Sequence, residues 1–141
     1  MFDPTKEVPN LELCRRLKEL GFPQEEGGWY WINGKLVFLT KGKKGYLVWD
    51  PENVNYYLVD EIENFLKAPT CRELGEWLPT EIECDGKIFL YRQTLKRKEF
   101  PYWIWYGYRY EHLHSVEADT EPNARAKMLI WLAENGYVRL L

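Results

Sequence analysis

The stretch Trp29-Tyr30-Trp31-Ile32-Asn33-Gly34-Lys35-Leu36-Val37-Phe38-Leu39 decides the fold class of this chain. Two runs rich in aromatic and aliphatic residues flank an Asn-Gly pair, and such runs favour β-strands. A type I′ turn needs a positive φ at both central residues, which Asn and Gly adopt more readily than other residues. The stretch therefore predicts a β-hairpin, whose strands are antiparallel because so short a connection permits nothing else.

More strands are predicted on both sides of this hairpin. Asp85-Gly86 lies between the β-prone runs 81–84 and 87–91 and predicts a second hairpin. After the Gly- and Lys-rich turn 41–45, residues 46–49 are predicted as a third strand of the first group. Residues 54–59 are also β-prone, whereas residues 60–66 fit a short helix as well. Residues 102–110 are predicted as one long aromatic strand, which residues 112–116 continue.

Three helices are predicted from end signals and apolar spacing. Asn10 caps a helix that ends before Gly21, and Thr70 with Glu73 forms a capping box for a short helix that Pro79 stops. The last helix begins after Thr120 and ends before Gly136, which is expected in the left-handed conformation. Strands joined by tight turns, together with these helices, predict one α+β domain over residues 1–141. Its antiparallel sheet is built from β-hairpins, with about three helices packed on it.

Charge and composition exclude several classes of protein. The net charge is −3 and no apolar run approaches the length of a membrane span, so neither a membrane partner nor a whole-chain attraction to nucleic acid is expected. The first residues lack the pattern of a signal peptide, which predicts a cytoplasmic protein. In that compartment Cys14, Cys71 and Cys84 are expected as reduced thiols, because their spacing suits no metal site.

Three segments carry a resemblance to known proteins: 11–24, 68–79 and, most specifically, 118–136 (Ala118-Asp119-Thr120-Glu121-Pro122-Asn123-Ala124-Arg125-Ala126 onward). In this order they resemble a group of small uncharacterised proteins of bacteriophages and prophages. The resemblance implies an origin in a phage or another mobile element and a compact sandwich of helices and sheet. It implies no activity.

Residues that could carry chemistry are few. His112 and His114 would share one face of a regular strand, with Glu117 or Asp119 as oxygen ligands, but two histidines without a third strong ligand make a poor metal site. The alternating carboxylates Glu81, Glu83 and Asp85 are expected on a solvated face. No nucleophile, phosphate-loop or metal motif is present. The sequence therefore predicts no catalytic residue, metal or cofactor, and leans against an enzyme.

The strongest candidate for a binding site is the aromatic strand 102–110, in a chain with 16% aromatic residues. Strand alternation puts Trp103 on one face and the tyrosines on the other, and we expect Trp103 in the core and Tyr106, Tyr108 and Tyr110 at an exposed or semi-exposed surface. The alternative is that helices cover both faces of the sheet, so that both sets are structural. The predicted binding residues are Tyr106, Tyr108, Tyr110 and Arg109, with Lys96, Arg97 and Lys98 in the preceding loop.

The function predicted from these features is a non-catalytic module that binds a macromolecule, with a protein as the expected partner. The alternative is a module that binds single-stranded nucleic acid through the aromatic strand and the basic loops at 41–44 and 96–98. A small metal-dependent hydrolase is the third hypothesis.

Overall fold

A computed structural model describes residues 3–24, 27–95 and 101–141 of the chain. Its elements follow in this order: η1 (Pro4–Lys6), α1 (Leu11–Glu19), β1 (Gly28–Ile32), β2 (Lys35–Lys41), β3 (Tyr46–Asp50), β4 (Asn55–Val59), β5 (Leu66–Lys67), α2 (Cys71–Trp77), β6 (Glu81–Cys84), β7 (Lys87–Leu95), β8 (Tyr102–Tyr108), β9 (Glu111–Ala118) and α3 (Glu121–Glu134). The predicted α+β class is confirmed.

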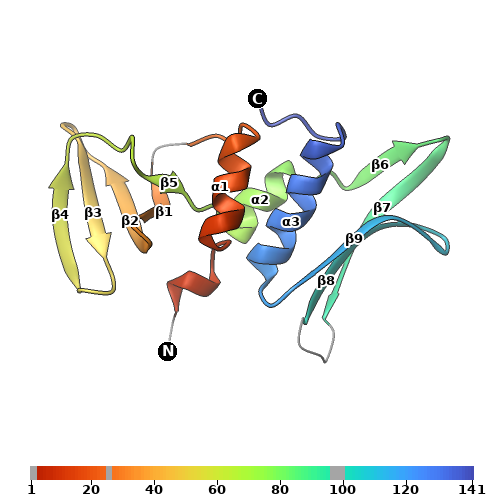
Figure 1. Ribbon diagram of the computed structural model, residues 1–141, viewed down its shortest axis with the longest axis horizontal. Coiled ribbons are helices and arrows are strands. Elements are labelled where there is room, and N and C mark those ends of the chain that lie inside the picture. The colour runs from red at the N-terminus through yellow and green to blue at the C-terminus, as the bar shows by residue number, and fades with distance from the viewer. Residues whose placement is uncertain (1–2, 25–26, 96–100) are drawn as a thin grey trace.

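The strands form two antiparallel sheets with the helices between them (Figure 1). Sheet A has the order β4-β3-β2-β1-β5, and sheet B has the order β6-β7-β8-β9. The sequence analysis placed all hairpins in one sheet. The strands divide into two groups, β1 to β5 and β6 to β9, and each group pairs only within itself. Sheet A meets the helices at its β5 side, and β4 is the strand farthest from them (Figure 1).

The two predicted hairpin turns have the expected backbone. The φ angles are 51° at Asn33 and 78° at Gly34, and 51° at Asp85 and 76° at Gly86. Positive values at both central positions are those of a type I′ turn. Local turn chemistry therefore sets the β1–β2 and β6–β7 pairings.

The predicted helix caps are also confirmed. The Asn10 side chain accepts a hydrogen bond from the Leu13 amide, and Thr70 with Glu73 makes both bonds of a capping box. At the end of α3, the amide of Tyr137 donates to the Leu132 carbonyl across a left-handed Gly136. Among the described residues, no helix is long and apolar enough to cross a membrane.

The main core lies between the helices and sheet B. Its fully buried side chains include Leu17 of α1, Leu74 of α2, Ile104 of β8 and Leu129 of α3. Sheet A has two smaller clusters, one on each face. Tyr30, Val37, Leu39, Val48 and Phe65 fill one of them, and Val8, Cys14, Leu36 and Ala68 join the other face to α1.

Two segments differ from the sequence predictions. The chain reverses after Tyr108, and β9 pairs back along β8, where one long strand was predicted. Arg109 has a φ of 54° in this turn, a conformation that its residue type does not signal. Residues 60–65 form a loop without a helix, in which the Phe65 amide donates to the Ile62 carbonyl.

Candidate functional site

The predicted aromatic strand is β8, and Tyr106 and Trp103 lie on the faces opposite to those expected. Tyr106 is fully buried against the helices, so the expectation that it reaches the surface is wrong. Its hydroxyl donates to the Pro79 carbonyl at 2.6 Å, and burial raises its pKa. Trp103 is half-buried on the outer face and stacks on Trp105, with 4.2 Å between ring centroids, whereas the core was expected to hold it. Helix α3 covers the face of sheet B that carries Ile104 and Tyr106.

The other predicted binding residues lie around the turn between β8 and β9. Tyr108 is half-buried, with the Lys87 ammonium 5.8 Å and the Arg109 guanidinium 5.3 Å from its ring centroid. Lys87 also pairs with Glu111 at 2.8 Å. Tyr110 is fully exposed at the tip of the turn. The predicted residues Lys96, Arg97 and Lys98 lie outside the described residues.

The two histidines point to opposite faces of sheet B. A shift of register between Tyr106 and Gly107 puts His114 opposite Tyr106 and His112 opposite Gly107. His114 therefore stacks on Trp131 of α3, whereas His112 lies 5.8 Å from the Trp105 ring. The expectation that both imidazoles share one face is wrong, because the bulge breaks the alternation. In residues 3–24, 27–95 and 101–141, no group of three or more His, Cys, Asp or Glu side chains is placed to hold a metal ion.

Sheet A carries an aromatic surface that the sequence analysis did not single out. Four aromatic side chains face one another across four strands: Trp29 of β1, Phe38 of β2, Trp49 of β3 and Tyr56 of β4. We call them the aromatic row. The ring centroids of Trp29 and Phe38 are 5.1 Å apart, and those of Trp49 and Tyr56 are 4.5 Å apart. The row thus consists of two ring pairs, which Phe38 and Trp49 bring side by side as cross-strand partners.

The aromatic row becomes more exposed toward the outer strand. Trp31, on the same face, donates its indole N–H to the Pro9 carbonyl at 3.2 Å, so the inner end of this face lies against the N-terminal segment. Phe38 is 39% exposed and Tyr56 is 61% exposed. Leu47 and Leu58 form a second cross-strand pair beside the row, and Leu58 is 78% exposed. The face is thus covered near the helices and uncovered at β3 and β4.

A buried carboxylate fixes the turn that presents Tyr56. Asp50 accepts hydrogen bonds from Lys35 at 2.9 Å and from the Asn53 side chain at 2.9 Å. These two bonds hold the pKa of Asp50 at about 2, so the carboxylate is charged at neutral pH. Its other oxygen accepts from the Glu52 amide. The connection between β3 and β4 is therefore held in one conformation, and the outer end of the aromatic row with it.

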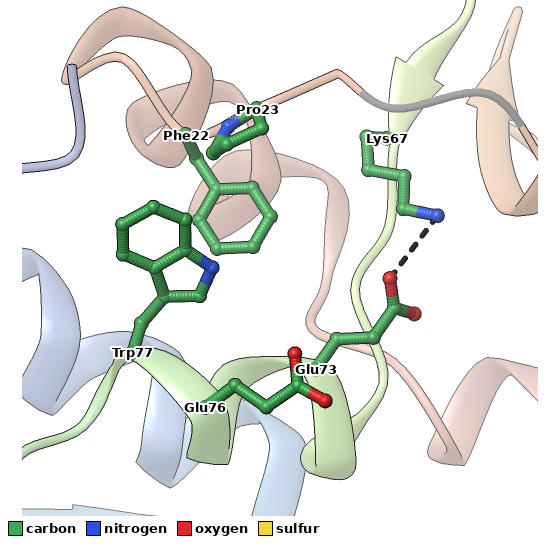
Figure 2. Close-up of a pocket in the computed structure, with 6 residues that line it drawn as sticks. All are labelled: Phe22, Pro23, Lys67, Glu73, Glu76 and Trp77. Carbon is green, nitrogen blue, oxygen red and sulfur yellow. Dashed lines mark ion pairs between the residues drawn. The ribbon is translucent and has the colours of Figure 1, made fainter.

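A pocket of about 350 Å³ lies where sheet A meets the helices (Figure 2). The Lys67 side chain is only 4% exposed, and its ammonium donates to the Gly27 carbonyl at 2.6 Å and pairs with Glu73 at 3.2 Å. Phe22 and Trp77 form the apolar wall opposite this ion pair (Figure 2). Because both partners of Lys67 belong to other elements, the ammonium ties β5 to α2 and to the start of β1. The pocket holds an internal ion pair, and its described lining residues include no nucleophile paired with a general base.

Two of the three cysteine thiols lie where burial disfavours the thiolate. Burial raises the pKa of Cys14 to about 12 and that of Cys71 to about 11. Both therefore remain protonated at neutral pH, and a thiolate is the form that reacts. Neither residue suits nucleophilic chemistry.

No family model matches this chain, and neither a curated protein nor a solved structure is similar to it. The resemblance to bacteriophage and prophage proteins stays a prediction.

Proposed function

We propose that this protein is a binding module that docks another protein onto the aromatic row and the adjoining Leu47 and Leu58. The observation that carries the proposal is the cross-strand alignment of four aromatic side chains on a face left uncovered at its outer end. Trp, Tyr and Phe are enriched at the centres of protein interfaces, where they contribute most of the binding energy.

The composition of this face favours a protein over a charged ligand. The strand residues that share it are Trp29, Trp31, Leu36, Phe38, Thr40, Leu47, Trp49, Tyr56, Leu58 and Leu66, none of which is charged. A large contiguous apolar patch that is exposed to water often marks an interaction site. Burying it against an apolar partner surface is favourable at roughly 25 cal/mol for each Å².

A photo-crosslinking residue in place of Tyr56 tests the proposal, with the same residue in place of the exposed Tyr110 as the matched control. We expect one protein to be captured from the Tyr56 position alone. With that protein purified, calorimetry should give a negative heat-capacity change, the signature of apolar burial. Tyr56→Ser and Leu58→Ser should each weaken binding at least about tenfold.

A loss of binding is informative only if both variants keep the fold. Tyr56 and Leu58 are exposed, so we expect their substitution to leave the fold intact. Both variants should melt within a few degrees of the wild type, since surface changes cost about 0.5 kcal/mol or less. Capture from both crosslinker positions alike, or affinity unchanged in both variants, would refute docking on this face.

A second candidate function has its own observation. On the outer face of sheet B, the stacked pair Trp103 and Trp105 lies beside Arg92, which is opposite Trp105. Aromatic rings beside cations suit the bases and phosphates of single-stranded nucleic acid. The exposed Lys43 and Lys44 are on sheet A, across the helical layer from this face (Figure 1), so they do not extend it. A steep salt dependence of binding to labelled single strands would favour this function.

A further inference from the structure

The edge of sheet A at β4 differs from the other sheet edges. The edge strands are β4 and β5 in sheet A, and β6 and β9 in sheet B. Strand β5 has two residues, β6 carries Glu81 and Glu83, and β9 carries Glu111 and Glu117. Short length and charged side chains are the usual protections against pairing with another chain. Strand β4, with the sequence Asn-Tyr-Tyr-Leu-Val, has neither protection.

The backbone of β4 is available for pairing. It pairs with β3 on one side only, and no other strand in the described part of the chain lies on its outer side. Alternate residues of an antiparallel edge strand direct their N–H and C=O groups away from the sheet. Strand β4 also projects farthest from the helices, so its outer side is sterically open (Figure 1).

The residue before β4 has a backbone conformation that is unfavourable for its residue type. Val54, just before the strand, has a φ of 49° and is 75% exposed. A β-branched residue in the left-handed region is a rare outlier, and such outliers concentrate at functional sites. The position thus combines an unfavourable backbone with an apolar side chain in water.

The charges around β4 indicate what occupies its edge. Residues 46–66 contain five carboxylates and no Lys or Arg. Glu52 precedes β4, and Asp60 and Glu61 follow it, all three exposed. Lys43 and Lys44 belong to the turn between β2 and β3, which lies against the end of β4, since a Cβ atom at Gly45 would meet the Val59 carbonyl oxygen at 2.6 Å. The carboxylates Asp60, Glu61 and Glu63 outnumber these two lysines at that end. A strand added at this edge would have a carboxylate beside each of its ends.

We infer that β4 receives an extended segment of another protein as an additional strand, and that this segment has apolar residues at alternate positions and Lys or Arg at its ends. The inference rests on the proposed function and names the partner chemistry for the same sheet. Main-chain hydrogen bonds to β4 give affinity, and the alternate side chains lie beside Tyr56 and Leu58. The added strand extends the aromatic row by one strand.

A second copy of this chain is a poorer occupant of the edge. Antiparallel pairing of two β4 strands about a twofold axis would bring Glu52 of each copy toward Asp60 and Glu61 of the other. Like charges at both ends of a strand pair oppose it. A segment with Lys or Arg at its ends would place positive charges beside the same carboxylates, which favours its binding.

The test uses the full chain and a peptide of alternating Val and Thr with Lys at both ends. We expect saturating peptide to slow hydrogen exchange at alternate β4 amides by at least about tenfold, because these amides gain a partner. The same peptide with Glu at both ends should bind at least about tenfold more weakly. The triple variant Glu52→Lys/Asp60→Lys/Glu61→Lys should reverse this preference, since it exchanges the sign of the charge at each end of β4.

A peptide N-methylated at alternate residues is the control for strand pairing, because it keeps the side chains and loses the backbone donors. Equal binding of the methylated and unmethylated peptides would overturn the inference, as would equal binding of the Lys and Glu peptides. A dimer of the free protein would also overturn the inference if it protects the β4 amides without any peptide and persists in both Glu52→Lys and Glu61→Lys.

The two proposals fail separately. If Tyr56 captures a partner and the peptides leave β4 unprotected, the edge inference is wrong and the docking face stands. If the Lys peptide protects β4 while Tyr56→Ser and Leu58→Ser leave partner affinity unchanged, the docking face is wrong and the edge inference stands.

Discussion

The imidazole of His114 lies flat on the indole of Trp131, with 4.1 Å between the ring centroids and 4° between the planes. Tyr137 also stacks on Trp131, with 5.6 Å between the ring centroids. The stack joins β9 to α3 and to the segment after it. Burial in this stack lowers the pKa of His114, because the charged imidazolium loses hydration there.

The lowered pKa of His114 makes the stability of the fold depend on pH. Above the ordinary histidine pKa the side chain is neutral in both states, and its full contribution is present. As the pH falls from about 7 to about 5, the unfolded chain takes up the proton first, so the folded state loses stability. We expect His114→Gln to reduce the loss of denaturation midpoint over this range. An equal acid response in the wild type and His114→Gln would contradict the assigned stack.

Tyr106→Phe removes a buried hydrogen bond and little volume. The Pro79 carbonyl loses the hydroxyl that donates to it at 2.6 Å. We expect the free energy of unfolding to fall by about 1–2 kcal/mol, measured by urea denaturation. The matched variant Tyr110→Phe alters a fully exposed side chain and should change it by less than about 0.5 kcal/mol. Similar effects of the two variants would contradict the burial of Tyr106.

Gly136→Ala tests the end of α3. Gly136 has a φ of 79°, and a Cβ atom there would meet nothing within 4 Å. The cost is therefore conformational alone, and we expect a loss of roughly 1 kcal/mol in the free energy of unfolding. An unchanged denaturation midpoint would show that the helix ends in another way.

Val54→Asn is expected to stabilise the protein. Asn tolerates the left-handed conformation that Val54 adopts at a φ of 49°. Relief of this strain should raise the free energy of unfolding by about 1 kcal/mol. Leu58→Asn, at an exposed position without a positive φ, is the control and should give no increase. A loss of stability in Val54→Asn would mean that the valine side chain makes a contact worth more than the strain.

Elements with local causes could be predicted from the sequence. Asn33-Gly34 and Thr70 with Glu73 act within a few residues of themselves, so the hairpin and the capping box follow from the residue types alone. That Trp29 and Phe38 are cross-strand partners could also be predicted from the sequence, because a two-residue turn fixes the register of both strands. The facing of Phe38 and Trp49 depends on the longer turn at 42–45, whose geometry the sequence does not specify.

The sequence by itself determined the α+β class, the hairpins, the helix ends and the division of each strand into two faces. Only the tertiary structure decided which face of each strand is buried. Alternation separates Trp103 from Tyr106 equally well in either orientation, and the packing of α3 on one side of sheet B makes the choice. The bulge between His112 and His114 likewise depends on where distant segments pack, and so does the open outer strand of sheet A. Whether a residue is buried depends on the segments that pack against it as well as on its own type.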